Sequence, residues 1–566
     1  MKSTELDSNS QGENGVDADG ASSVPRKKPR FAGGGRAFAC FALVESIALV
    51  TFARFGGLLW FRFDEWQFLA VRTAWGRDSL LAPHGFVHPQ MLPVLAYRLL
   101  WWLFGLRTYT PYLLLIIVMH LACAFLLRMV MLRAGARAWP ATIVASAFVF
   151  FGAGYECIIW PFQIGYVGSL LFGLIHIQLS DHDGHFDKRD ALGLIAALAG
   201  LACSAIGITM VFAAGVAIVI RRGWKMSLAQ TVPLATIFVL WFEFFARERY
   251  EFAKGFHFIK PATPMELIRF STGAFFNTLH AFGNSEALGL ALVALLFSGI
   301  VLSWRARTSS EIRAQLAVPI GLFAGMIASL LLTGYGRQSH LGAANASRYL
   351  YVVAALVVPA LGIAASAWVN RSAAVGAVAL AVIIVGMPGD LHHMVAYVHK
   401  QEPTEATFKA MMLTLPRVPL ARVLPDTERP ITGFLSIPGY VTAGWLARGV
   451  ESGRIPAPRR ENPGSRANAT LRWAIRDDGP CFECGPAGRV PSDFKCRPLA
   501  ATTTFRIPDR AKLLVVGSVV LRPIIGRLDV PYPLTITSAK RPERLSARAD
   551  IAFRAFSPSR TATICT

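Results

Sequence analysis

The stretch RFDEWQFL, residues 62–69, places two adjacent carboxylates, Asp64 and Glu65, directly after a long apolar run. The chain continues through APHGFVHPQ, which supplies His84, His88 and Gln90. Carboxylates and imidazoles are the side chains that most often remove a proton from a hydroxyl group. Their concentration in one short polar segment indicates a site for acid–base chemistry. The alternative is a helix end exposed to water.

Cationic side chains that suit an anion accompany these groups. Arg62 and Arg72 flank the carboxylates, and Arg348 in NASRYLY begins a later apolar run that Arg337 and His340 precede. The planar guanidinium group contacts two phosphate oxygens at once. We therefore expect Arg348, with Arg337 and His340, to bind a phosphate. The alternative for Arg348 is an anchor at the membrane interface.

A further carboxylate, Glu156, lies in GYECIIW, and Gln163 follows it in the same segment. Asp64 and Glu156 offer the hard oxygen ligands that Mg²⁺ or Mn²⁺ prefers, although nothing in the sequence demands a cation. The alternative for Glu156 is a residue at the membrane interface, held by a backbone amide.

The elements that position these residues are membrane segments. Of the 566 residues, 54% are hydrophobic and 16% are charged, whereas soluble domains carry about 25% charged residues. Repeated apolar runs near the bilayer-spanning length of about 20 residues predict a polytopic α-helical membrane protein. The net charge of +22 fits topology control and contact with anionic lipid, and we expect no nucleic-acid partner.

We expect about 11 membrane segments of near-spanning length. They are 37–60, 109–132, 139–154, 162–180, 227–246, 286–304, 314–333, 348–370 and 373–388, with 191–220 counted as two short segments that turn near Ser204 and Gly207. With this count the Arg-rich loops lie in the cytoplasm together with the N-terminus, and everything after about residue 389 lies outside. Residues 247–285 are then an external loop.

The first external loop, 61–108, breaks the charge rule because it carries five arginines, which a bound phosphate would explain. Within it MLPVLAYRLLWWLFGL, residues 91–106, has apolar residues at helical spacing interrupted by Arg98. This pattern predicts a helix that lies along the membrane surface.

The composition divides the chain into four parts. Residues 1–36 are a disordered basic cytoplasmic tail, 37–390 the transmembrane domain, 391–479 an extracytoplasmic connector with helices, and 480–566 a small β-sandwich of short alternating runs. The last part holds Cys481, Cys484, Cys496 and Cys565. Four cysteines outside the cell predict two disulfides in one of three pairings, with a zinc site as the rival.

These features resemble the GT-C-type glycosyltransferases, which use polyprenyl-phosphate sugars as donors. The resemblance rests on the loop that opens with DEW, on HPQMLPVLAYRLLWWLFGL, on YECIIWPFQIGYVGSLL and on ASRYLYVVAALVVPAL, over roughly 37–390. It implies a bacterial plasma-membrane enzyme, an inverting hexosyl- or pentosyltransferase that acts on the outer face. The acceptor would be a glycan, lipid or protein of the cell envelope. Asp64 would be the general base, with Glu65 as the second choice.

The resemblance also implies that Arg348, Arg337, His340, Arg62 and Arg72 hold the donor phosphate, and that His84, His88, Gln90, Glu156 and Gln163 shape the pocket. The main alternative is a transporter or flippase of lipid-linked sugars. A transporter places ionisable residues near the bilayer midplane, and the apolar runs here are nearly free of acids. A third alternative is a structural subunit without activity.

One other cluster carries potential metal ligands. SDHDGHFDKRD, residues 180–190, contains two histidines and four aspartates in a short loop on the cytoplasmic side. A solvated turn that caps the next helix is the interpretation we favour there, and a metal site is the alternative.

Overall fold

The structure of the chain is a computed structural model. It describes residues 34–72, 80–85, 87–255, 262–337, 343–431, 440–459, 463–480, 494–499, 502–524, 534–537, 542–557 and 562–566. Residues 1–33 of the predicted N-terminal tail, His340, Cys481 and Cys484 lie outside these residues, as does the side chain of Arg337. The tail was predicted to reach residue 36, but Gly35 and Arg36 already belong to the first helix.

Most of the chain is helical, and the helices fall into two groups along the sequence. The first group is α1 (Gly35–Gly56), α3 (Met91–Phe104), α4 (Thr110–Arg133), α5 (Ala138–Val149), α6 (Glu156–Ile159), α7 (Ile164–Leu179), α8 (Lys188–Cys203), α9 (Ile206–Arg222), α10 (Trp224–Trp241) and α11 (Arg247–Gly255). The second group is α12 (Pro264–Gly283), α13 (Glu286–Arg305), α14 (Ser309–Glu311), α15 (Ala317–Arg337), α16 (Ser347–Arg371), α17 (Ala373–Thr414), α18 (Ala443–Glu451) and α19 (Pro463–Ala474).

The helices confirm a polytopic α-helical membrane protein. Among the described residues, eight helices are long and apolar enough to cross a bilayer. They are α1, α4, α7, α10, α13, α15, α16 and α17, some of them extended by a short adjoining helical turn. The shorter α5, α8 and α9 correspond to the remaining predicted segments. The predicted turn near Ser204 is confirmed, because α8 ends at Cys203, Ser204 is extended, and α9 begins at Ile206.

Two parts of the helical region differ from the sequence-based expectation. The predicted loop 247–285 contains α12, whose apolar character is diluted by Glu266, Arg269 and Asn277. The last predicted span ends at residue 388, yet α17 continues through Pro388 and Pro403 to Thr414. Proline removes one helical hydrogen bond and usually ends a helix, which is why the continuation was not foreseen.

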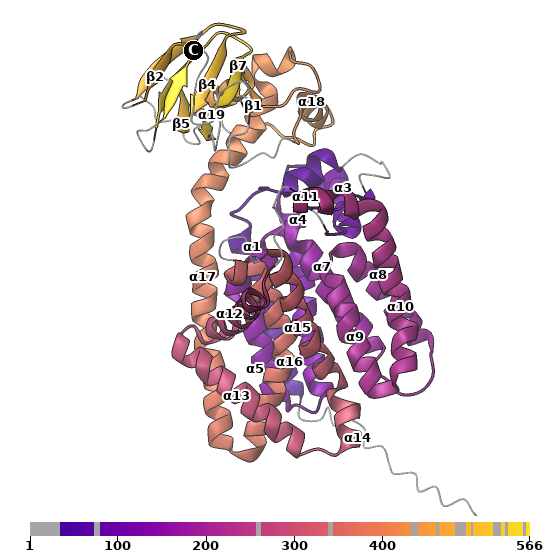
Figure 1. Cartoon of the computed structure of the whole chain (residues 1–566). Coiled ribbons are helices and arrows are strands. Elements are labelled where there is room, and N and C mark those ends of the chain that lie inside the picture. Colours follow the sequence, from indigo (N-terminus) through magenta and orange to yellow (C-terminus); the bar gives the residue numbers. More distant parts are fainter. Residues whose placement is uncertain are drawn as a thin grey trace, which may run out of the picture.

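Figure 1 shows how the helices are arranged. The helices lie side by side as one bundle, with α3 and α11 at the end nearest the β-domain and α14 at the opposite end. The long α17 runs from the far end of the bundle up to the β-domain. The loop with Asp64 precedes α3, so the predicted site and the β-domain lie at the same end of the bundle.

The C-terminal domain consists of two antiparallel sheets, as the alternating short runs predict. One has the order β1-β7-β4-β9-β2 and the other β3-β8-β5-β6. The strands are β1 (Ile475–Pro480), β2 (Cys496–Pro498), β3 (Thr503–Ile507), β4 (Lys512–Val516), β5 (Ser518–Pro523), β6 (Leu534–Thr537), β7 (Glu543–Ala547), β8 (Ile551–Phe556) and β9 (Thr563–Cys565). Gly517, at φ +81°, separates β4 from β5 and sends them to different sheets.

A disulfide joins Cys496 of β2 to Cys565 of β9, which settles one predicted pair. The connector before the β-domain also contacts the loop around α3. The indole of Trp445 in α18 donates a hydrogen bond to the Leu69 carbonyl at 3.1 Å and stacks on Trp101 with ring centroids 5.0 Å apart. The connector therefore closes over the segment that holds the predicted site.

Candidate active site

The two adjacent carboxylates of the opening motif have opposite surroundings. Glu65 is fully buried, and its carboxylate accepts hydrogen bonds from the Arg62 backbone N–H at 2.9 Å, Tyr97 at 2.8 Å and Trp160 at 3.2 Å. Burial raises the pKa of Glu65 to about 7, against the opposing effect of these donors. No substrate reaches a carboxylate enclosed in this way, so Glu65 is best suited to hold the loop in shape.

Asp64 points the other way, and its side chain is 46% exposed. Its Oδ2 lies 3.8 Å from His84 Nε2, and the other ring nitrogen of His84, Nδ1, lies 2.6 Å from Gln67 Oε1. Asp64 and Gln67 are three residues apart on one turn, in which the Gln67 N–H donates to the Asp64 carbonyl at 3.0 Å. One imidazole therefore spans both side chains.

His84 presents one ring nitrogen to each of these side chains. Nδ1 faces the amide oxygen of Gln67, and Nε2 faces the carboxylate of Asp64. Asp64 thus has an imidazole next to it, a group that exchanges protons near neutral pH, and an open side toward solvent. This is the arrangement that a general base needs if it is to pass on the proton that it takes.

The backbone before Asp64 is strained. Phe63 has φ +46°, a left-handed conformation that costs a residue with a side chain roughly 1–2 kcal/mol. Its ring is 47% exposed and lies edge-on to Trp160, with the centroids 5.9 Å apart. Strained residues of this kind concentrate at functional sites. The π-helical turn Gln67–Val71 follows directly, and such turns also occur at functional sites.

Arg62 is buried and used within the protein. It donates a hydrogen bond to Tyr397 at 3.0 Å, lies 3.7 Å from Glu405, and covers the Trp160 ring at 5.2 Å. Tyr397 and Glu405 belong to α17, so Arg62 ties the active-site loop to that helix. These contacts favour a structural role over the predicted contact with the donor.

Arg72 is also enclosed by its own loop. Its guanidinium donates to the carbonyls of Ala82 and Pro83 at 2.6 and 2.8 Å, and it is only 2% exposed. These bonds hold the segment that carries His84. Arg72 therefore positions this imidazole, and its contacts do not favour a direct contact with phosphate.

Glu156 and Arg348, which the sequence placed in two separate segments, form an ion pair. The Glu156 Oε2 atom lies 3.1 Å from Arg348 Nη1 and accepts the Arg348 backbone N–H at 3.3 Å. The Glu156 N–H in turn donates to Ser347 at 3.1 Å. The Arg348 side chain is 32% exposed and stays accessible to an anion.

An apolar cavity of about 280 Å³ lies beside this ion pair. Tyr349, which follows Arg348, lines it together with His88, Tyr166 and side chains of α9, α10 and α15. The Arg348 guanidinium covers the Tyr349 ring at 5.0 Å. Arg348 is not itself part of the lining, but its guanidinium lies on Tyr349, which is. An apolar volume between membrane helices thus lies one residue away from a cation, an arrangement that suits a lipid phosphate.

The loop that carries the histidines connects the two halves of the site. His84 and His88 exchange backbone hydrogen bonds of 2.8 and 3.3 Å. The side chain of His84 faces Asp64, and that of His88 lines the cavity. The His88 ring lies 3.1 Å from Ser204 Oγ, at the break between α8 and α9. The segment 84–88 thus contacts Asp64 at one end and the cavity at the other.

The two predicted glutamines are buried near this segment. Gln90 is 3% exposed and packs against Gly165 at the start of α7, where an added Cβ would lie 2.7 Å from its Oε1. Gln163 is 3% exposed as well, and its Oε1 accepts no hydrogen bond within the described part of the chain. Neither glutamine is among the residues that line the cavity.

The sequence did not single out Gln67, Tyr166 or Tyr349. Each had a signal in the chain, because Gln67 lies within RFDEWQFL and Tyr349 follows Arg348 in ASRYLY. Tyr166 lies in the segment of Gln163. Only the fold shows that Gln67 shares His84 with Asp64 and that the two tyrosines face one cavity.

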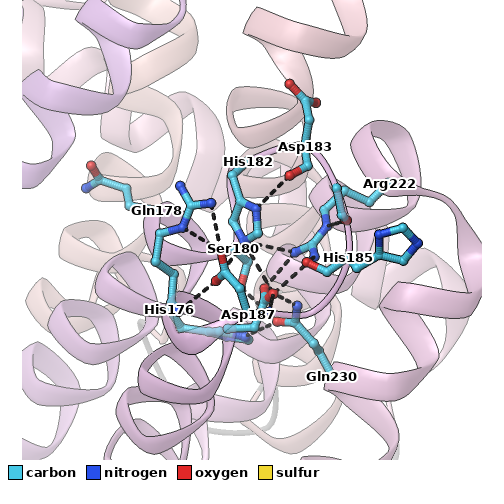
Figure 2. A network of polar contacts seen from close by, with 12 residues as sticks. His176, Gln178, Ser180, His182, Asp183, His185, Asp187, Arg222 and Gln230 are labelled. Carbon is cyan, nitrogen blue, oxygen red and sulfur yellow. Dashed lines mark hydrogen bonds and ion pairs between the residues drawn. The ribbon is translucent and has the colours of Figure 1, made fainter. Parts of the chain in front are cut away.

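The acidic cluster of 180–190 has a structural explanation. Asp187 caps α8 in a reciprocal arrangement with Asp190, as the predicted capping turn requires. His182, Asp187 and Asp190 place ligand atoms within 4.8 Å of one another, but Arg222 Nη1 lies 2.6 Å from Asp190 and 3.3 Å from His182 Nε2. Figure 2 shows Arg222 pointing into this group, where its charge takes the place of a cation.

Asp64 and Glu156 do not share such a cluster among the described residues. The carboxylate of Asp64 faces His84, and that of Glu156 faces Arg348. Each carboxylate therefore has a protein partner of its own, and Mg²⁺ or Mn²⁺ stays an expectation of the sequence.

Comparisons with known proteins give two similar structures. No protein-family profile matches the chain, and no curated protein matches it. The chain is similar to the apo structure of ArnT from Cupriavidus metallidurans, with 15% identity over 75% of this chain and 90% of that chain at a TM-score of 0.44. It is also similar to ArnT of the same organism bound to undecaprenyl phosphate, with 15% identity, coverage of 74% and 89%, and a TM-score of 0.41. Likeness at this level does not carry the activity or ligand of that protein over to this chain.

Proposed function

We propose that the protein is a membrane glycosyltransferase that moves a sugar from a polyprenyl-phosphate donor to a hydroxyl group of a cell-envelope glycan, lipid or protein. The observation that carries the proposal is the segment 84–88, which contacts a half-exposed carboxylate through His84 and lines an apolar cavity through His88, with Arg348 on the ring of Tyr349 in the same lining. A base, a site for phosphate and a volume for a lipid are the three parts that this reaction needs.

The residues divide the reaction between them. The lipid chain of the donor lies in the cavity, and its phosphate binds Arg348. Asp64 takes the proton of the acceptor hydroxyl as the oxygen bonds to the anomeric carbon, and the bond from that carbon to the phosphate oxygen breaks. Attack opposite the leaving phosphate inverts the anomeric centre. His84 Nε2 receives the proton from Asp64, and Arg348 stabilises the charge that grows on the phosphate.

Arg348 is paired with Glu156 before the donor arrives. A donor phosphate must therefore share or replace this carboxylate, and Arg348 has a second N–H edge with which to do so. Removal of a guanidinium that binds the leaving group typically lowers the rate by about 10²–10³-fold. Arg337, His340 and the divalent cation remain expectations of the sequence.

The test is release of polyprenyl phosphate by the purified chain in lipid nanodiscs. A panel of polyprenyl-phosphate hexoses and pentoses is offered with envelope extract as acceptor, and both the released lipid and the glycosylated product are measured. Product formation that Arg348→Ala lowers by 10²-fold or so supports the proposal. Donor binding without release from any member of the panel contradicts it and favours a carrier of lipid-linked sugars.

A further inference from the structure

A second cavity, with a polar lining, lies at the end of the bundle opposite the β-domain. Its volume is about 400 Å³, and it is formed where α13 and α16 end and where Gly135 follows α4. Its polar lining consists of Ser303, Arg305, Arg307, Ser366, Asn370 and Arg371. In the described part of the chain no carboxylate lines it, so three guanidinium groups surround one volume without an acidic partner there.

The helix dipoles offset only part of this positive charge. The C-termini of α4, α13 and α16 meet at the cavity, and each is equivalent to about −0.5 elementary charge. Together they amount to about −1.5, and the nearby carboxylate of Glu311, which interacts with Arg307, adds −1, against +3 for the three arginines. A surplus of about +0.5 remains, which favours an anionic group over a cation.

Arg307 has a fixed position within the cavity. It donates hydrogen bonds to the Ser303 carbonyl at 2.9 Å, to Gln315 at 3.2 Å and to the Ala134 carbonyl at 3.2 Å. These bonds cap the ends of α13 and α4 and hold the wall of the cavity. Arg305 and Arg371 are exposed, and neither makes an ion pair among the described residues. They are therefore available to a ligand.

Gly135 keeps the cavity open. It has φ +82°, and a Cβ at this position would lie 3.0 Å from Gln315 Oε1 and 3.5 Å from Arg307 Nη2. Ser366 accepts the Arg137 N–H at 2.8 Å, which leaves its own hydroxyl proton to donate toward the cavity. The lining thus offers charged donors and a hydroxyl donor to an oxyanion.

The position of the cavity relates it to the bilayer. Both α13 and α16 are helices of membrane-spanning length and composition, and the cavity lies at their last turns. On α13 the side chains of Phe297, Val301 and Trp304 are about half exposed, at 50%, 48% and 53%. An exposed tryptophan at the end of an apolar helix marks the depth of lipid headgroups.

We propose that this cavity binds a phosphate group presented by an anionic phospholipid of the bilayer. The headgroup phosphate lies between Arg305 and Arg371, and the acyl chains follow the exposed apolar face of α13. Basic pockets between membrane helices at headgroup depth bind anionic lipids by this chemistry. The site lies at the other end of the bundle from Asp64 and does not depend on the proposed reaction.

The test is retention of lipid by the full chain, purified from nanodiscs of phosphatidylcholine doped with phosphatidylglycerol and examined by native mass spectrometry. The wild type should retain phosphatidylglycerol in preference to phosphatidylcholine. Arg305→Gln/Arg371→Gln removes both charge-assisted bonds to the phosphate and should lower this preference by about 10²-fold or more. Arg313→Gln/Lys225→Gln removes two exposed cations outside the cavity lining and should keep the preference.

Each single variant, Arg305→Gln or Arg371→Gln, should lose part of the preference, so the test does not depend on the folding of the double variant. A further arm adds inorganic phosphate. A fall in the amount of retained phosphatidylglycerol when excess phosphate is added supports the proposal. Equal retention by the wild type and Arg305→Gln/Arg371→Gln overturns it. Binding of inorganic phosphate to the wild type without any retained phosphatidylglycerol also overturns the proposal, because the ligand would then be a soluble phosphate compound.

Discussion

The imidazole of His84 lies 3.8 Å from the carboxylate of Asp64, while its other nitrogen binds Gln67 at 2.6 Å. This relationship separates Asp64 from its neighbour Glu65, which is enclosed by Tyr97, Tyr109 and Trp160. One carboxylate of the pair faces solvent with an imidazole beside it, and the other is sealed in the loop.

Glu65 should make stability depend on pH. Its pKa is raised from 4.5 to about 7 by burial, so the folded chain keeps a proton that the unfolded chain loses above pH 4.5. Its contribution to stability is therefore complete below pH 4.5 and is lost as the pH rises through about 7. The loss amounts to about 3 kcal/mol at high pH. Thermal unfolding in lipid nanodiscs between pH 5 and 8 measures it.

The variant Glu65→Gln provides the control for this prediction. It cannot ionise, so the fall in unfolding temperature between pH 5 and 8 should be smaller than in the wild type. Identical pH profiles for the two proteins would show that Glu65 ionises normally in the folded chain.

Glu156 and Arg348 should have opposite effects on donor binding. Arg348→Gln removes a charge-assisted bond to the phosphate and should weaken the binding of a polyprenyl-phosphate sugar by roughly 10–100-fold. Glu156→Gln removes the competing carboxylate and should strengthen binding several-fold. Arg54→Gln removes an exposed cation near the end of α1 and should change neither. Weaker binding in both Glu156→Gln and Arg348→Gln would mean that the ion pair itself, and not the free guanidinium, shapes the site.

The network in Figure 2 should contribute to stability and not to metal binding. Asp190 is fully buried, lies 2.6 Å from Arg222 Nη1, and accepts a hydrogen bond from the Gln230 amide at 2.7 Å. Asp190→Asn leaves the buried Arg222 charge with the Gly184 and His185 carbonyls but without its carboxylate, which should destabilise the chain by about 3–5 kcal/mol. Glu243→Gln breaks the exposed Glu243–Arg247 pair and should cost about 0.5 kcal/mol or less. Thermal unfolding measures both, and a shift of the wild type on addition of Zn²⁺ or Mn²⁺ would contradict the assignment.

The sequence predicted the bundle better than its connections. Apolar runs and the turn at Ser204 located the membrane helices, because burial in lipid demands long apolar stretches. The helix α12 was not predicted because its sequence contains polar residues. This helix packs among its neighbours and does not need a uniformly apolar surface. The two prolines in α17 suggested an end to the helix, but its packing against other helices of the bundle and α19 maintains the helix beyond them.

The site was predictable in its residue types and not in its pairings. Asp64, His84, Glu156 and Arg348 stand out in the sequence as charged or polar groups in loops between apolar runs. Nothing in their spacing indicates that Glu156 contacts Arg348, 192 positions further along the chain. The burial of Glu65 likewise depends on aromatic side chains from three separate segments. Such contacts arise from the fold, which local sequence patterns do not encode.

The most direct test of the account compares sugar transfer by the wild type and by Asp64→Asn. The amide keeps the size of the side chain but cannot accept the hydroxyl proton, so we predict a loss of about 10²–10⁴-fold in turnover while donor binding persists. Asp426→Asn, which changes an exposed aspartate of the connector, should keep full activity. Equal turnover by the wild type and Asp64→Asn would contradict the assignment of Asp64 as the base.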